Sequence, residues 1–220
     1  MSMNKVFFFL PNIIGYVRII LYLASFLCHT LSHWQLCIIF YSLGFLLDEF
    51  DGRAARLLNQ NTNFGASLDM VADRSATAGL CLILAQLYPN YALAFILLIA
   101  LDISSHYYLI YATGMVGNSS HKDTANWSKN WLLNLYYGNK QFMDVLIAGN
   151  ELFYIFLYFA HYSVSFSLSW MGWNLSFWQV AIFACLPIYL LKQSTNILQL
   201  QSAARKIASL DLANREEKTE

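Results

Sequence analysis

Four aspartates stand at short, regular intervals between two apolar stretches of the chain, together with small and basic residues. The segment is Asp48-x2-Asp51-Gly52-x2-Ala55-Arg56-x8-Gly65-x3-Asp69-x3-Asp73. The first two aspartates are three positions apart and the last two are four apart, so on helices each pair shares one face. Carboxylates gathered beside apolar segments are costly unless a cation neutralises them. The spacing therefore points to chemistry that needs several carboxylates at once.

A polar turn over residues 59–63 separates the two pairs, and a helix hairpin folded there would bring the pairs toward each other. Hard cations such as Mg²⁺ and Mn²⁺ prefer carboxylate, water and phosphate oxygens as ligands. Two such ions about 3.5–4 Å apart are the usual arrangement for holding a reacting phosphate. The sequence therefore predicts a site for Mn²⁺ or Mg²⁺, with two ions, that acts on a phosphorylated substrate.

The residues between the two pairs fit a phosphate ligand. Gly52 removes a side chain where a nucleotide or phosphate must come close. Arg56, one turn later, offers a planar fork of donors to phosphate, and Thr62 in the turn can donate a hydroxyl hydrogen bond to the ligand. The alternative is that the aspartates only cap helices or pair with neighbouring arginines. That alternative explains any two of the acids, but not all four at these intervals.

The elements that must position this segment are membrane helices. The chain has 220 residues, of which 58% are apolar and 12% charged, too apolar for an ordinary soluble domain. The apolar stretches approach membrane-span length, with a helical period rather than the alternation of a barrel. We therefore predict an all-α integral membrane bundle, a single domain over residues 1–220. Its six transmembrane helices are expected at residues 13–28, 34–47, 68–88, 91–113, 145–161 and 173–191.

The polar ends of the chain and the distribution of charge predict how this bundle is oriented. Residues 3–10 are expected to lie in the membrane interface, and residues 192–220 to form a cytoplasmic helical tail. With six spans, all thirteen Lys and Arg fall on one side or at the span ends that face it. The positive-inside rule places that side, and with it the aspartate segment, in the cytoplasm.

The aspartate segment resembles the signature of the CDP-alcohol phosphatidyltransferase family at every signature position. Outside the signature, the chain is similar to the eukaryotic members that use inositol as the acceptor alcohol. Four further segments carry this likeness: Pro11-Asn12-Ile13-Ile14-Gly15-Tyr16-x-Arg18, Asn59-Gln60, Gly149-Asn150-Glu151-Leu152-Phe153-Tyr154 and Ala203-Ala204-Arg205.

The resemblance implies a reaction in which a hydroxyl of myo-inositol attacks the phosphorus next to the lipid in CDP-diacylglycerol, and CMP leaves. It implies that Asp48, Asp51 and Asp69 bind metal, and that Asp73 is both a metal ligand and the general base. It also assigns three positions to the CDP-lipid: Gly52, Arg56 and Thr62. A homodimer in the endoplasmic reticulum membrane, surrounded by membrane lipid and without a nucleic acid partner, is the expected setting.

Three other interpretations remain open at this point. Serine or glycerol phosphate could replace inositol as acceptor, although glycerol phosphate should need extra fixed cations for its phosphate. Membrane prenyltransferases also hold a diphosphate with aspartates and Mg²⁺, but they place their acidic motifs far apart. Ion transporters tend to bind near the midplane at repeat interfaces, and no repeat is visible here.

Polar residues elsewhere in the apolar stretches are secondary candidates. Asp102 with His106, and Asn150 with Glu151, either line the polyol pocket or pair across helices to hold the bundle together.

The loop over residues 114–141 and the first apolar stretch supply the remaining candidates. We hypothesise that His121 and Lys122 help to admit or hold inositol; the alternative is an interfacial loop with aromatic residues at headgroup level. The amide of Asn12 can contact a cytosine edge or a phosphate. Arg18 is expected to extend to the lipid headgroups.

Overall fold

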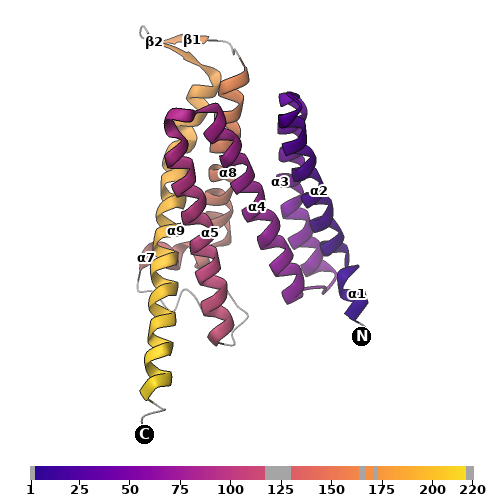
Figure 1. Ribbon diagram of the computed structural model, residues 1–220, viewed down its shortest axis with the longest axis vertical. Coiled ribbons are helices and arrows are strands. Elements are labelled where there is room, and N and C mark those ends of the chain that lie inside the picture. Colours follow the sequence, from indigo (N-terminus) through magenta and orange to yellow (C-terminus); the bar gives the residue numbers. More distant parts are fainter. Residues whose placement is uncertain (1–2, 117–129, 164–166, 171–172, 217–220) are drawn as a thin grey trace. The chain divides into compact units, whose positions relative to one another are not determined.

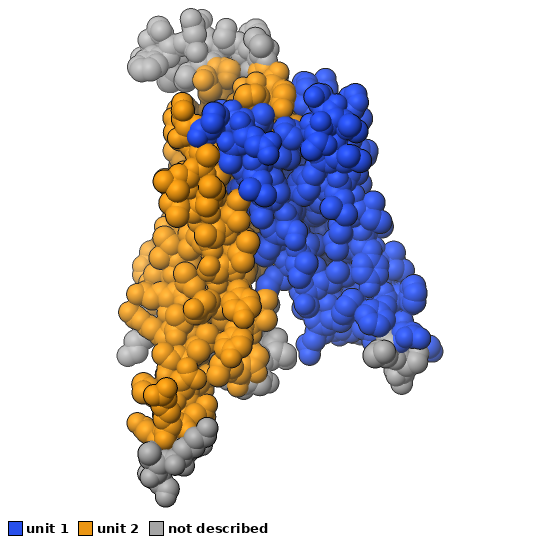
Figure 2. Space-filling view, in the orientation of Figure 1, with its two compact units in different colours: residues 1–89 blue, residues 90–220 orange. Residues whose placement is uncertain are grey.

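The computed structural model describes residues 3–116, 130–163, 167–170 and 173–216 (Figure 1). His121 and Lys122 lie outside the described residues. The chain divides into two compact units, residues 1–89 and residues 90–220 (Figure 2).

The first unit consists of helices. They are α1 (Met3–Phe7), α2 (Leu10–Thr30), α3 (Trp34–Leu57) and α4 (Asn63–Leu87). Pro11 lies in the first turn of α2, where its missing N–H breaks no helical hydrogen bond. Asn59 ends the α3 region with φ of 52°, a left-handed conformation that asparagine tolerates better than most residues. That residue turns the chain from α3 toward α4.

Helix α2 is the element that connects the other two long helices of this unit. It packs along α3 and against α4, whereas α3 and α4 have little direct contact with each other. The packing with α3 is close at Gly44, where an added Cβ would lie 2.7 Å from the ring of Tyr22. A Cβ at Gly79 of α4 would likewise overlap the ring of Phe26. Glycines therefore allow α2 to approach both neighbours.

The second unit is built around one long helix. A 3₁₀ turn, Pro89–Tyr91, leads into α5 (Ala92–Val116), and α7 (Trp131–Gly138) precedes α8 (Lys140–Tyr162). The antiparallel strands β1 (Ser167–Trp170) and β2 (Trp173–Ser176) follow, with Ser167 opposite Ser176. Helix α9 (Phe177–Glu216) then packs against α5, α7 and α8.

Aromatic rings fill the contact between α8 and α9. The ring of Phe153 stacks on that of Tyr189 with centroids 4.1 Å apart, and Tyr154 meets Tyr189 edge to face. An added Cβ on Gly149 would overlap Ile188, so the two helices approach closely at this point. The long final helix is thereby fixed against α8 within its unit.

The helical fold class is confirmed, and within the described residues the β1–β2 hairpin is the exception to it. The chain at residues 162–172 was expected to be a short connector. However, its Ser-Leu-Ser-Trp run alternates polar and apolar residues with the period of a strand. The tail after residue 191 continues the preceding helix without interruption, as expected, although that helix begins at Phe177 rather than at residue 173.

Among the described residues, four segments are long and apolar enough to cross a membrane, as in a multi-pass membrane protein. They are Leu10–Thr30, Pro89–Met115, Lys140–Tyr162 and Phe177–Glu216. The expected second and third spans lie within α3 and α4, which are long but carry the aspartates and are not among those four. Six spans therefore stay a prediction.

The prediction of a loop over residues 114–141 is wrong for the part of that segment that the structure describes. Residues 131–138 form α7, and α8 already begins at residue 140. Leu133 and Tyr136 of α7 are buried within the unit, and the hydroxyl of Tyr137 donates a hydrogen bond to Gln199 of α9 at 2.7 Å. Packing on α9 therefore orders a segment whose sequence resembled an interfacial connector.

Candidate functional site

The four aspartates meet at one side chain, Arg18 of α2. Nη1 of Arg18 lies 2.5 Å from Oδ2 of Asp51 and 2.7 Å from Oδ1 of Asp69. Nη2 lies 2.6 Å from Oδ1 of Asp48 and also contacts Oδ1 of Asp73. Each terminal nitrogen therefore bridges one carboxylate of α3 and one of α4.

The predicted convergence of the two aspartate pairs is correct, but the turn between them is only part of the cause. Because α3 and α4 hardly touch each other, α2 provides the packing that holds them at this distance. Arg18 is fully buried, and its guanidinium places a positive charge where the two pairs converge. The site is thus built from three helices rather than from one hairpin.

The aspartates differ in how far solvent reaches them. The side chain of Asp51 is 10% exposed and that of Asp69 is 47% exposed, with Asp48 and Asp73 between them. The cluster is therefore closed on the side of α3 at Asp51 and open on the side of α4 at Asp69. A ligand that reaches the carboxylates would meet Asp69 first.

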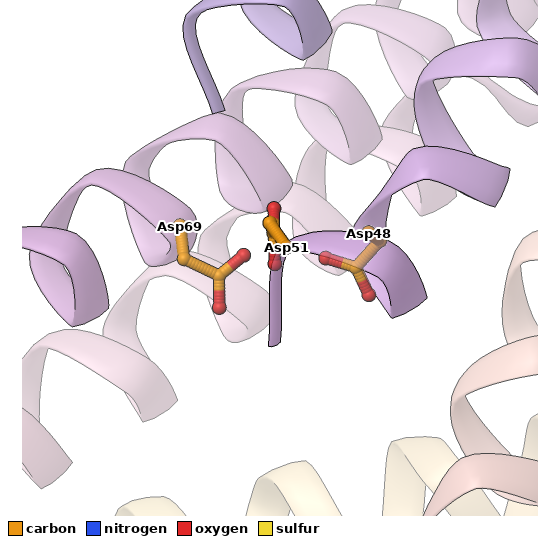
Figure 3. A group of neighbouring side chains, drawn as sticks. All are labelled: Asp48, Asp51 and Asp69. Atoms are coloured by element: carbon orange, nitrogen blue, oxygen red, sulfur yellow. The ribbon is translucent and has the colours of Figure 1, made fainter. Parts of the chain in front are cut away.

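Three of the carboxylates are close enough to share one cation. Asp48, Asp51 and Asp69 each offer an oxygen within 4.8 Å of the others, and Figure 3 shows the groups turned toward a common space. An all-carboxylate donor set suits Mg²⁺ or Mn²⁺. The residues present therefore fit the predicted metals, and Asp73 adds a fourth carboxylate through the same arginine.

Among the described residues, the charges at the site do not balance. Arg74 lies 3.5 Å from Oδ2 of Asp73, so two guanidinium groups face four carboxylates. Grouped carboxylates repel one another strongly when they are partly removed from water. An excess of negative charge remains, and divalent cations are the groups that would neutralise it.

Gly52 and Arg56 lie together on α3. An added Cβ on Gly52 would stand 3.5 Å from Nη1 of Arg56, an ordinary contact distance, and would meet no other atom closely. Packing among the residues that the structure describes therefore does not require glycine at this position. The Arg56 residue is exposed, and its guanidinium remains able to pair with an anion.

Thr62 has a local structural role that was not predicted. Its hydroxyl oxygen accepts a hydrogen bond from the backbone N–H of Gly65 at 3.0 Å, which caps the N-terminus of α4. The hydroxyl hydrogen is still a donor, so the cap is compatible with a ligand contact.

Asn12 is buried beside the same turn. Its amide nitrogen donates to the carbonyl of Val6 at 2.6 Å, and its Oδ1 would stand 2.8 Å from a Cβ on Gly65. Asn12 thus joins the N-terminal segment to α2 and lies close to the start of α4.

The signature identified in the sequence is thus assembled in space on α3 and α4. The family model described as CDP-alcohol phosphatidyltransferase matches residues 8–208, a range that contains all three helices of this site. The chain belongs to the CDP-alcohol phosphatidyltransferase family.

Curated relatives of this phosphatidyltransferase family match nearly the whole chain. A CDP-diacylglycerol–inositol 3-phosphatidyltransferase of Candida albicans is 42% identical over 96% of this chain and 86% of its own length. The human enzyme with the same description is 40% identical over 98% of both chains. That of Saccharomyces cerevisiae is 39% identical over 98% of this chain and 93% of its own. No solved structure matches the chain.

Arg18 is the site residue of this family member that sequence reasoning missed. It was interpreted as a side chain reaching the headgroups, yet it is buried against all four aspartates. A signal was present, because a charged residue inside an apolar helix usually pairs with an opposite charge. The four acids of the signature offered that opposite charge.

The secondary candidates lie in the second unit of this phosphatidyltransferase. Nδ1 of His106 is 2.8 Å from the carbonyl oxygen of Asp102 on the same helix. Gln193 of α9 donates to Oδ1 of Asn150 at 2.8 Å, so the predicted pairing across helices is confirmed there. Glu151 is buried and accepts from the Asn150 amide at 3.3 Å. Of these contacts, the hydrogen bond from Gln193 to Asn150 joins α8 to α9.

Proposed function

We propose that this protein transfers the phosphatidyl group of CDP-diacylglycerol to myo-inositol, forming phosphatidylinositol and releasing CMP. The observation that carries the proposal is the convergence of Asp48, Asp51, Asp69 and Asp73 on one position. It is supported by identity of about 40% to inositol phosphatidyltransferases over nearly the full chain.

The proposed reaction is a direct displacement at phosphorus. An inositol hydroxyl oxygen forms a bond to the phosphorus that carries the diacylglycerol, and the bond from that phosphorus to the CMP oxygen breaks. The electron pair of the broken bond leaves with CMP. Asp73 takes the hydroxyl proton, because an alcohol is a poor nucleophile at neutral pH without a base.

The carboxylates are proposed to hold two ions of Mn²⁺ or Mg²⁺, with Asp48, Asp51 and Asp69 as ligands and Asp73 as a shared ligand. When bound, such ions neutralise charge on a diphosphate and on the departing CMP. The protein itself fixes the carboxylates at one position by packing α2 against α3 and α4.

Three residues of the segment from Asp48 to Asp73 are proposed to contact the CDP-lipid. The exposed guanidinium of Arg56 pairs with a phosphate, and Gly52 leaves the adjacent space open. The support for Gly52 is that no close contact inside the protein explains its missing side chain. Thr62 donates its hydroxyl hydrogen while its oxygen caps α4.

A neutral acceptor fits the cations of the first unit. Arg18 and Arg74 contact the aspartates, and Arg53 pairs with Glu49 at 2.8 Å. With Arg56 assigned to the CDP-lipid, no described arginine of this unit remains for the phosphate of an acceptor such as glycerol phosphate. We keep His121 and Lys122 as the proposed inositol contacts, and Asn12 as a proposed residue of the substrate pocket.

The proposed setting is the endoplasmic reticulum membrane, with the aspartates facing the cytoplasm and the protein as a homodimer. The orientation rests on the one-sided distribution of lysine and arginine over the predicted loops. The compartment and the dimer rest on the family resemblance.

An acceptor-choice assay tests the function. Purified protein in detergent receives CDP-diacylglycerol, Mn²⁺ or Mg²⁺, and labelled inositol, serine or glycerol phosphate in separate reactions. We expect CMP release and a labelled lipid with inositol alone, and loss of both when a chelator removes the metal. Label in lipid with serine or glycerol phosphate instead, or with no acceptor, would contradict the proposal.

A further inference from the structure

Arg18 lies at the position that a shared cation would take among the aspartates. Its Nη1 and Nη2 contact oxygens of Asp48, Asp51 and Asp69, the same three side chains whose oxygens lie within 4.8 Å of one another (Figure 3). A divalent ion binds carboxylate oxygen at about 2.0–2.2 Å, closer than a guanidinium nitrogen does. The arginine and a metal thus draw on the same ligands.

Two cations cannot share this position without strong repulsion. An ion bound to Asp51 would lie within a few ångströms of Nη1, which is itself 2.5 Å from Oδ2 of that residue. The charges of a divalent ion and a guanidinium repel strongly at such a separation in a partly buried site. Metal and arginine are therefore competitors for the carboxylates.

We propose that Arg18 is an exchangeable counter-cation of the site. Its guanidinium holds the carboxylates of α3 and α4 together, and it yields them when divalent metal binds. This inference rests on the metal site of the proposed function. It means that Arg18, a residue outside the aspartate signature, affects how tightly that site binds metal.

The packing of the first unit explains why such a cation is needed. Helices α3 and α4 have little direct contact, and each terminal nitrogen of Arg18 joins one aspartate of α3 to one of α4. Without a cation between them the carboxylates would repel one another. Arg18 on α2 thus keeps the metal ligands close to one another until metal replaces it.

The hydrogen bonding of Arg18 favours exchange over a permanent structural tie. Its Nε is buried and has no hydrogen-bond acceptor among the described residues. Buried arginines with a fixed structural part normally satisfy all their donors, because an unpaired buried donor is costly. Here only the two nitrogens that contact the carboxylates are satisfied, so within the described residues Arg18 forms its hydrogen bonds and ion pairs with the proposed metal ligands alone.

The test is Mn²⁺ binding to the full-length protein, measured by the electron paramagnetic resonance signal of free Mn²⁺. In Arg18→Gln the competitor is gone, so we expect the Mn²⁺ dissociation constant to fall by about tenfold, with the number of bound ions unchanged. Thermal unfolding is measured in parallel, in chelator and in Mn²⁺. The variant should unfold at a lower temperature than the parent in chelator, and Mn²⁺ should remove most of that difference.

Two further variants make the result specific. Arg53→Gln removes the same charge from an exposed position that pairs with Glu49, and it should match the parent in both measurements. Arg18→Lys keeps a charge but lacks the planar fork that bridges four carboxylates, so its Mn²⁺ affinity should lie between those of the parent and Arg18→Gln.

The other possible results contradict either the proposal for Arg18 or the metal site itself. Unchanged or weaker Mn²⁺ binding in Arg18→Gln would make Arg18 a fixed tie and overturn the proposal. The same conclusion follows if Arg18→Gln cannot be recovered folded in Mn²⁺ while Arg18→Lys binds Mn²⁺ like the parent. A parent protein that binds no Mn²⁺, or binds it equally after Asp51→Asn, would instead remove the metal site of the proposed function.

Discussion

Nη1 of Arg18 lies 2.5 Å from Oδ2 of Asp51, the most deeply buried of the four aspartates. The two residues are 33 positions apart in the chain and lie on different helices. Their ion pair joins α2 to α3 at the point where α4 also contributes Asp69 and Asp73. The geometry of the signature thus depends on a residue outside it.

The base role of Asp73 is tested by Asp73→Asn. We expect CMP release to slow by about 10²–10⁴-fold, since an amide cannot accept the inositol proton. The measurement is the initial rate at saturating inositol, over a range of Mn²⁺ concentrations. Asp69→Asn, the variant of the most exposed ligand, should regain activity as Mn²⁺ is raised, whereas Asp73→Asn should not. Equal recovery of both variants would argue against a base at Asp73.

Gly52→Ala separates ligand binding from protein stability. The new methyl group meets only an ordinary contact with Arg56, and alanine favours a helix over glycine. We therefore expect an unchanged or higher melting temperature in detergent. The KM for CDP-diacylglycerol should nevertheless rise by about tenfold, because the methyl group enters the space assigned to the ligand. A parent-like KM would remove Gly52 from the proposed lipid site.

Gly65→Ala should lower the stability of the protein, unlike Gly52→Ala. Its Cβ would lie 2.8 Å from Oδ1 of Asn12 and 3.1 Å from Oγ1 of Thr62. Overpacking of this kind costs about 1–3 kcal/mol of unfolding free energy. Asn12→Ala removes the nearer obstacle, so the double variant should lose less stability than the two single changes added together. Simple additivity would mean that the two side chains do not meet.

Thr62 combines a helix cap with the proposed ligand contact. Substitutions at this position can test the effect on stability separately from the effect on substrate binding. Thr62→Ala should cost about 0.5–2 kcal/mol through loss of the cap to Gly65, and it should also raise the KM for CDP-diacylglycerol. Thr62→Ser keeps the hydroxyl and should preserve both values. If Thr62→Ala lowers only the melting temperature, Thr62 is a cap and not a substrate contact.

The spacing of the aspartates was enough to predict that each pair shares a helix face. Spacing within one helix is a local property, fixed by 3.6 residues per turn. The same holds for the long helical tail after residue 191, whose apolar residues recur at helical intervals. Both predictions are confirmed because neighbouring residues determine them.

Tertiary packing decided the rest. Arg18 became the centre of the site because α2 packs against both α3 and α4, and no local pattern around residue 18 specifies partners 30 to 55 positions away. Contact with α9 likewise ordered α7, where sequence alone suggested a loop. The sequence by itself determined which residues form the aspartate signature and which of them share a helix face, since spacing along a helix is local. Only the three-dimensional structure decided which cation faces those groups, because that pairing depends on contacts between distant helices.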